Sequence, residues 1–383
     1  MSETPSDIEA EADRAAASGD LARAISLLDR LSSTAEPSLA LWTKLGAMRR
    51  ATGDIKGALH AIEKALALAP LDFSALLARA MLLDRLKDPG AGEAFSNAIA
   101  RLPAEENIPE AMAAAVAHAR MRADQHRAGI EERLVRAIPS GLDRSHEQRL
   151  SRFASNVSRR TRHHHQEPSD FHYPGLPEIE FHDPAHFPEL AALEAATDAI
   201  RSEFEALIAA EAAEMVPYIH YPERVPLRQW KELNNNRDWT AIHLLRNGSA
   251  VEGNARHCPQ TMAAVAKLPQ PHVPGASPNA MFSLLAPRTR IPPHTGVANT
   301  RLVCHLPLIV PPDCGFRCGA TTRQWVVGET FVFDDTIEHE AWNDSGELRV
   351  VLIVDLWPPA LDAVEREAVA RMIAATGVSF TGA

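Results

Sequence analysis

The chain has 383 residues, of which 45% are hydrophobic and 23% charged, with a formal net charge of −11. This composition excludes a fully disordered chain and leaves room for two or three domains. The negative charge argues against nucleic acid or an anionic membrane as a general partner. Because no apolar run approaches the roughly 18 residues that span a bilayer, and no signal-like segment opens the sequence, we expect no membrane span and a cytoplasmic protein.

Residues 6–137 predict a helical repeat domain. Gly19-Asp20 recurs as Gly53-Asp54, and small and large apolar residues recur with the same spacing of 34 positions. The middle copy has Trp42, Leu45 and Gly46 ahead of a second group formed by Ala58, Ala65 and Pro70, and it resembles the tetratricopeptide repeat. Three copies predict three pairs of antiparallel helices, which need a cap for stability. Residues 109–137 are the predicted capping helix.

Such a repeat block has two interpretations. Its concave face would capture a peptide or a partner protein, or the block would serve as a structural or dimerising support. The sequence favours neither interpretation over the other.

Residues 138–170 are predicted to form a linker, because helical periodicity fades there. His163, His164 and His165 suggest a metal site. Adjacent side chains point in different directions, however, so we favour a solvated linker for this stretch.

Residues 171–383 predict a second domain. An amphipathic helix is expected over residues 187–212, and an irregular stretch follows whose Trp230 and Trp239 either line a substrate mouth or belong to ordinary loops. Short apolar runs separated by turn residues then predict the strands of a β sandwich; they cover residues 301–310, 315–318, 322–327, 329–334 and 348–357.

The sandwich carries histidines and arginines where a buried site is expected. His294 is followed by Gly296, although a metal site of two histidines and one carboxylate would place its acid there. Taken singly, each histidine is more often a core residue. Arg301 and His305 share one face of a predicted strand, because their separation is even. Arg349 lies in another apolar strand, where a cation is costly unless it holds an anion such as a dicarboxylate.

Several motifs together resemble the aspartyl/asparaginyl β-hydroxylase family. They are His294-Thr295-Gly296, Arg301 to Leu306, Gly315 to Cys318, Phe333 to Asp335, His339 to Asn343, and Arg349 to Pro358. The resemblance extends over roughly residues 170–360. It implies a multidomain α + β protein in which the tetratricopeptide-like repeats precede a double-stranded β-helix (jelly-roll) oxygenase domain with flanking helices.

The resemblance also implies site residues and cofactors. His294 and His339 would be ligands of Fe(II), and the glycine at position 296 is the family's own pattern. Ser283 and Arg349 would hold the distal carboxylate of 2-oxoglutarate, and His305 its metal-proximal end. The family usually has an arginine two residues before that histidine, where this chain has Val303. Arg301 either reaches this end of the cosubstrate instead, or the contact is missing.

Two further residues precede the second histidine. Asp334 and Asp335 either orient His339 or cap the turn before it.

The function implied is a 2-oxoglutarate-dependent dioxygenase that uses Fe(II), 2-oxoglutarate and O2 to hydroxylate Cβ of an Asp or Asn residue in a protein or peptide, or a related small molecule. Three alternatives stay open: a catalytically inactive jelly roll beside a binding scaffold, which Val303 encourages, or hydroxylation of a free amino acid or of a lipid acyl chain. The expected partners are a protein, peptide or small-molecule substrate and a protein on the repeat face.

Overall fold

The computed structural model describes residues 4–34, 36, 38–105, 108–221, 231 and 233–377. Its contacts divide the chain into two compact units, Met1–Arg162 and His163–Ala383. No helix in these described ranges combines the length and the hydropathy that a membrane span requires.

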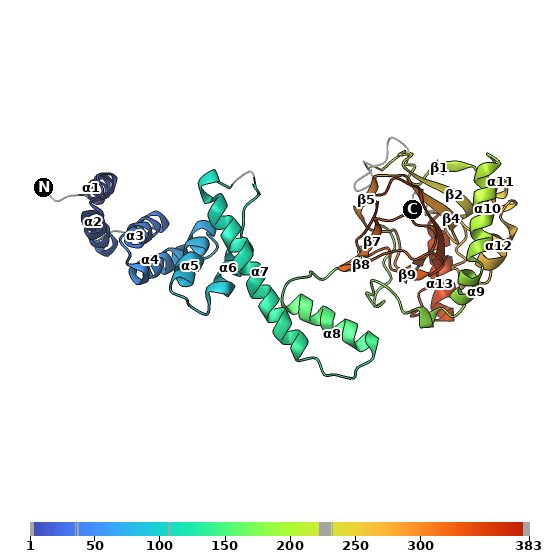
Figure 1. Ribbon diagram of the computed structural model, residues 1–383, viewed down its shortest axis with the longest axis horizontal. Helices are drawn as coiled ribbons and strands as arrows, with labels where there is room; N and C mark the ends of the chain where they lie inside the picture. The colour runs from blue at the N-terminus through green and yellow to red at the C-terminus, as the bar shows by residue number, and fades with distance from the viewer. Residues whose placement is uncertain are drawn as a thin grey trace. The chain divides into compact units, whose positions relative to one another are not determined.

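The N-terminal unit is built from helix pairs, as the repeats predict (Figure 1). Their bounds are α1 Pro5–Ala17, α2 Leu21–Thr34, α3 Leu39–Ala51, α4 Ile55–Leu68, α5 Phe73–Arg85 and α6 Ala91–Ile99. A short 3-10 turn, η2 (Glu110–Met112), then leads into the long helix α7 (Ala113–Arg136). Val116 and Ala119 of α7 join the same apolar core as Phe95 of α6, so α7 caps the stack.

The recurring Gly-Asp pair marks where one helix ends and the next begins. Gly19 and Gly53 have φ angles of 84° and 85°, which favour glycine. The carboxylates of Asp20 and Asp54 then accept from the backbone N–H groups of Arg23 and Gly57, in the first turns of α2 and α4, at 3.0 and 2.9 Å. Gly46 lets α3 approach α4, because a Cβ there would lie 2.8 Å from Cδ1 of Ile62. The pattern of small residues therefore sets how closely the helices pack.

The range predicted as a linker differs from expectation in two ways. Helix α8 (Arg144–Val157) lies within it, and Asp143 caps this helix by accepting from the His146 N–H at 3.0 Å. Furthermore, His163 and His165 turn toward each other, with Nδ1 of the first 3.1 Å from Nε2 of the second. Alternate residues of an extended chain face the same side, so the prediction that these side chains diverge is wrong for this pair.

The C-terminal unit contains two antiparallel sheets. The larger has the order β1-β2-β4-β11-β6-β9, with β3 beside β2, and the smaller has the order β5-β10-β7-β8. The strands are β1 Met215–Pro217, β2 Trp239–Arg246, β3 Ser249–Ala250, β4 Ala280–Leu285, β5 Thr289–His294, β6 Leu302–Ile309, β7 Cys314–Cys318, β8 Thr321–Arg323, β9 Phe331–Phe333, β10 His339–Asn343 and β11 Arg349–Leu356. This is a jelly roll, as predicted.

Both faces of the larger sheet are covered. Alternate residues of β6 divide between two cores: Cys304 packs beneath the helices, whereas Val303 packs between the sheets. Helices α9, α10 and α12 contribute to the outer core (Figure 1). The helical elements of this unit are η3 Pro184–His186, α9 Leu190–Ala195, α10 Thr197–Ala209, α11 Glu252–Ala255, α12 Pro259–Val265 and α13 Ala363–Thr376. The side chains that face inward are therefore shielded from solvent.

Candidate metal and anion site

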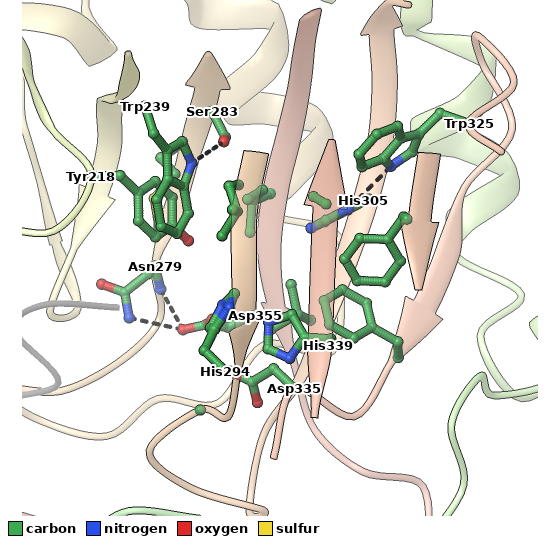
Figure 2. Close-up of a pocket in the computed structure, with 18 of the residues that line it drawn as sticks. Tyr218, Trp239, Asn279, Ser283, His294, His305, Trp325, Asp335, His339 and Asp355 are labelled. Atoms are coloured by element: carbon green, nitrogen blue, oxygen red, sulfur yellow. Dashed lines mark hydrogen bonds between the residues drawn. The ribbon is translucent and has the colours of Figure 1, made fainter. Parts of the chain in front are cut away.

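One pocket between the two sheets collects all six residues that the sequence singled out. Figure 2 shows the histidine pair with Asp335 and Asp355 at one end of this pocket, and Ser283, Trp239 and Trp325 at the other. The six are His294, His339, Ser283, His305, Arg349 and Arg301. Apolar side chains make up most of the remaining wall; they include Met281, Ile291, Val303, Phe316, Phe333 and Ile353.

The two candidate metal ligands are paired across the smaller sheet. His294 ends β5 and His339 begins β10, and the two residues are partners in the strand register. Their ring centroids lie 4.0 Å apart, and both residues are buried. Sheet pairing therefore brings together two imidazoles that are 45 positions apart in the chain.

Backbone carbonyls fix the tautomer of both rings. Nδ1–H of His294 donates to the Pro292 carbonyl at 2.8 Å, and Nδ1–H of His339 donates to that of Ile337 at 3.1 Å. A carbonyl only accepts, so Nε2 of each neutral ring carries the lone pair. Burial lowers the pKa of His294 to about 4, and burial together with the neighbouring His294 holds the pKa of His339 well below its usual range. Both rings are therefore neutral near pH 7, as metal ligation requires.

Gly296 makes room for a carboxylate from another part of the chain. A Cβ at this position would lie 2.2 Å from Oδ2 of Asp335. Oδ1 of Asp335 is buried and has no hydrogen-bond partner among the residues that the structure describes. Burial raises the pKa of Asp335 to about 7, against the opposing effect of Arg301. An acidic group thus does lie beside the histidine pair, although the sequence has glycine where a carboxylate was sought.

Arg301 is committed to two buried carboxylates. Its Nη2 donates to Asp335 at 2.8 Å and its Nη1 to Asp355 at 3.2 Å. Burial alone would lower the pKa of Arg301, but these two carboxylates raise it above its usual value. Asp355 also accepts from Ser277 and Asn279. This arrangement differs from the expectation that Arg301 replaces the missing family arginine at the cosubstrate.

Arg349 is also a buried cation, but its surroundings differ from those of Arg301. It is 2% exposed, and within the described ranges it forms no ion pair with a carboxylate. Its Nη1 donates to the Ser283 carbonyl at 3.3 Å, its guanidinium lies 4.8 Å from the Trp325 ring centroid, and its Nε is buried without a partner. Burial lowers the pKa of Arg349 to about 10. A buried arginine in this state has donors available to an anion.

His305 lies among aromatic rings with one nitrogen fixed. Its Nδ1 accepts from Nε1–H of Trp325 at 3.3 Å, and an indole nitrogen can only donate, so Nε2 of the neutral ring carries the proton. Burial, with Arg349 nearby, holds the pKa of His305 well below its usual range. His305 is therefore a neutral hydrogen-bond donor.

Sequence reasoning missed Tyr218, which lines the pocket, and left the role of Trp239 open. Tyr218 stacks on Trp239 with ring centroids 3.9 Å apart, and Nε1–H of Trp239 donates to the Ser283 hydroxyl at 3.1 Å. Trp239 thus belongs to a strand and to the pocket, whereas Trp230 lies outside the described residues. Of the two acids before His339, Asp334 caps the turn by accepting from the Thr336 N–H at 2.9 Å.

The residues of this pocket fit a metal ion together with a dicarboxylate. Two neutral imidazoles with defined lone pairs lie beside a buried carboxylate oxygen that lacks a partner. A buried cation, a hydroxyl and a neutral imidazole donor are available to carboxylate groups. Fold and site together define a jelly-roll protein with a buried pocket between its sheets that contains paired histidines and a buried arginine.

Comparison with known proteins agrees with the resemblance seen in the motifs. Residues 194–359 of the C-terminal unit match the family model described as Aspartyl/Asparaginyl beta-hydroxylase.

Three relatives illustrate the similarity. The human aspartyl/asparaginyl beta-hydroxylase is 34% identical over 138 residues, which are 36% of this chain and 18% of that protein. An ornithine lipid ester-linked acyl 2-hydroxylase from Rhizobium tropici is 35% identical over 181 residues, 46% of this chain and 60% of that protein. The human aspartate beta-hydroxylase domain-containing protein 2 is 32% identical over 208 residues, 53% of this chain and 54% of that protein. The chain thus spans less than two thirds of each of these relatives.

Proposed function

We propose that the C-terminal unit is an Fe(II)- and 2-oxoglutarate-dependent dioxygenase that hydroxylates Cβ of an Asp or Asn residue in a protein or peptide. The match of residues 194–359 to a hydroxylase family model, and the similarity to named hydroxylases, support this proposal. The observation that carries it is Arg349, a cation buried in a pocket with two neutral histidines and paired with no carboxylate of the described chain. Such a cation is stable when a bound anion neutralises it.

Each residue has a role in this proposal. His294 and His339 would hold the iron through Nε2, because their Nδ1 atoms are occupied by backbone carbonyls. Asp335 would supply the negative charge beside them that a glycine cannot. When bound, iron and 2-oxoglutarate supply the oxidising power for O2 activation, with succinate and carbon dioxide as coproducts.

The remaining groups would position the cosubstrate. Arg349 and the Ser283 hydroxyl would bind its distal carboxylate, and His305 would donate from Nε2–H to its other end. Arg301 would act indirectly, by holding Asp335 in place. The apolar wall between the sheets would exclude water and thereby strengthen these contacts.

Binding of 2-oxoglutarate to Arg349→Met tests the proposal. Loss of a buried charge pair costs about 2 kcal/mol or more, so we expect affinity to fall roughly 30-fold or more in an anaerobic titration of the iron-loaded protein. Arg290→Met is the matched control, because Arg290 is exposed and lies outside the pocket. Equal affinity in the two variants would refute the role of Arg349. If the unsubstituted protein bound neither iron nor 2-oxoglutarate, the inactive alternative suggested by Val303 would replace the proposal.

A lipid acyl chain is the second candidate substrate. The relative from Rhizobium tropici is named for an ester-linked acyl group of a lipid, and this chain matches more of that protein than of the other two relatives named above. Mass spectrometry of peptides and lipids after incubation with iron, 2-oxoglutarate and O2 separates the candidates. Gain of one oxygen on a peptide Asp or Asn supports the proposal, whereas gain on an acyl chain alone overturns its substrate.

A further inference from the structure

A second group of metal-ligating side chains lies at the start of the C-terminal unit, outside the pocket described above. His163, His165 and Glu178 are all exposed, and one donor atom from each lies within 4.8 Å of the other two. Nδ1 of His163 and Nε2 of His165 are 3.1 Å apart. The Glu178 carboxylate lies 3.1 Å from the far nitrogen of His165 and 3.9 Å from Nε2 of His163.

We propose that His163, His165 and Glu178 form a binding site for a divalent transition-metal cation, with zinc as the best fit. Two imidazole nitrogens that each lie about 2.0–2.1 Å from one tetrahedral ion are roughly 3.3–3.4 Å apart, close to the observed spacing. A carboxylate completes a ligand set that zinc accepts, and the exposed positions leave water as a further ligand.

The environment of this site separates it from the pocket. The cluster has no apolar enclosure and no buried cation for an organic acid, in contrast to the surroundings of His294. A site of nitrogen and oxygen ligands without imposed geometry binds Zn²⁺ or Cu²⁺ more tightly than Fe²⁺. The cation here therefore has a structural role, and no oxygen chemistry is assigned to it.

The segment that follows the cluster shows what the cation would stabilise. The backbone N–H of Gln166 donates to Glu178 at 3.1 Å, and Gln166 also forms a β-bridge with Ile337. The N–H of Glu167 donates to the Thr336 carbonyl at 2.8 Å, and that of Ser169 to the Gly296 carbonyl at 3.0 Å. This segment, residues 166–169, thus joins the loop before His339 to the loop after His294.

A cation at the cluster would fasten this segment at its first residues. Loop positions on either side of the pocket would then be held by one clamp, formed by the cluster and residues 166–169. We expect Zn²⁺ to raise the thermal stability of the C-terminal unit, because a ligand that binds only the folded state shifts unfolding upward.

Zinc titration of the chelator-stripped full chain tests the site. We compare the unsubstituted protein with His163→Ala/His165→Ala and with the matched control His172→Ala, which removes an exposed histidine outside the cluster. The double variant should lose one equivalent of bound zinc, and the control should lose none. Unchanged stoichiometry and affinity in the double variant would overturn the proposal.

Glu178→Gln provides a milder change. Glu178→Gln removes the negative charge of one of the three proposed ligands while keeping the shape of its side chain, so we expect zinc affinity to fall roughly tenfold or more. Zinc affinity equal to that of the unsubstituted protein would remove Glu178 from the site.

Two further measurements test which residues are ligands of the cation and whether the cation stabilises the fold. In His294→Ala/His339→Ala, bound Cu²⁺ should show nitrogen couplings in its electron paramagnetic resonance spectrum, and these should disappear when His163→Ala/His165→Ala is added. In the His294→Ala/His339→Ala background, which removes the histidines of the pocket, free zinc about a hundredfold above Kd should raise the unfolding temperature by roughly 5–10 °C, and this rise should disappear when His163→Ala/His165→Ala is added. Copper spectra without nitrogen coupling would overturn the ligand set, and an equal rise in both proteins would overturn the clamp.

Discussion

Substitution of Gly296 by alanine should destabilise the C-terminal unit strongly. The new Cβ would lie 2.2 Å from Oδ2 and 2.4 Å from Cγ of Asp335, whereas comfortable contacts are about 3.5–4.0 Å. The carboxylate cannot move aside freely, because Oδ2 accepts from Arg301 at 2.8 Å in a buried ion pair. Overpacking costs about 1–3 kcal/mol, and weakening this pair adds to the loss. We expect a total of about 3–5 kcal/mol.

The double variant Gly296→Ala/Asp335→Ala isolates the cause. Removal of the Asp335 carboxylate is itself costly, since Arg301 then retains Asp355 alone. In this background, however, the methyl group at position 296 fills vacated space, so its added cost should fall to about 0.5 kcal/mol or less. The coupling energy between the two positions would then be roughly 2.5–5 kcal/mol.

Urea unfolding followed by tryptophan fluorescence measures this cycle, since five of the six tryptophans lie in the C-terminal unit. Gly346→Ala is the matched control, because a Cβ there would meet no atom within 4 Å. If Gly296→Ala cost the same with and without Asp335, steric competition between the two residues would be refuted. A cost equal to that of the control would refute it as well.

Three other substitutions test separate features. Trp325→Phe removes the indole N–H that fixes the ring orientation of His305, so 2-oxoglutarate affinity should fall about 5- to 10-fold. Unchanged affinity in a calorimetric titration would argue against this hydrogen bond. Burial lowers the pKa of His182 to about 4. Between pH 6.5 and 4, the unfolded chain therefore binds a proton at this residue that the folded chain does not bind. This difference in proton binding lowers the free energy of unfolding by about 2 kcal/mol from pH 7 to 5. In urea unfolding at the two pH values, His182→Leu should remove only this contribution, because the other buried histidines lose stability over the same range, and an unaltered pH slope would contradict it. Gly46→Ala should destabilise the helical unit by about 1–3 kcal/mol, as measured by thermal unfolding followed by circular dichroism. Because Cδ1 of Ile62 occupies the space of the new methyl group, adding Ile62→Val should restore part of the lost stability. A double variant no more stable than Gly46→Ala alone would contradict that contact.

Local patterns explain which parts of the fold could be predicted. The helical repeats follow from spacing within each copy, and the strands follow from alternation within short runs, so both are visible in the sequence. Helix α8 was missed because its apolar residues, such as Phe153 and Val157, are exposed and its sequence is rich in arginine and serine. A helix is predicted from sequence by a stripe of apolar residues that will pack in a core. In α8 that stripe is short and largely exposed, so the segment reads as polar.

Contacts between distant strands explain what could not be predicted in the site. His294 and His339 are singled out through the resemblance of the motifs around them, because each histidine taken singly is more often a core residue. The contact of Asp335 with the space at Gly296 joins two loops, and no spacing rule predicts it. The same holds for Trp325 beside His305, which depends on how a loop after β8 folds over the sheet.

Strand β11 places a positively charged and a negatively charged residue toward opposite ends of the pocket. Arg349 and Asp355 lie near its two ends, and their even separation of six positions puts both on the inner face, about 20 Å apart along the strand. Among the described residues, one end of the pocket therefore has a cation without a carboxylate partner, and the other has two carboxylates around the single cation Arg301. Insertion or deletion of one residue within β11 would turn one of the two groups toward the helix-covered face. The orientation of an anion in the pocket thus depends on the even separation of Arg349 and Asp355 along β11, because an odd separation would place the two side chains on opposite faces of the strand.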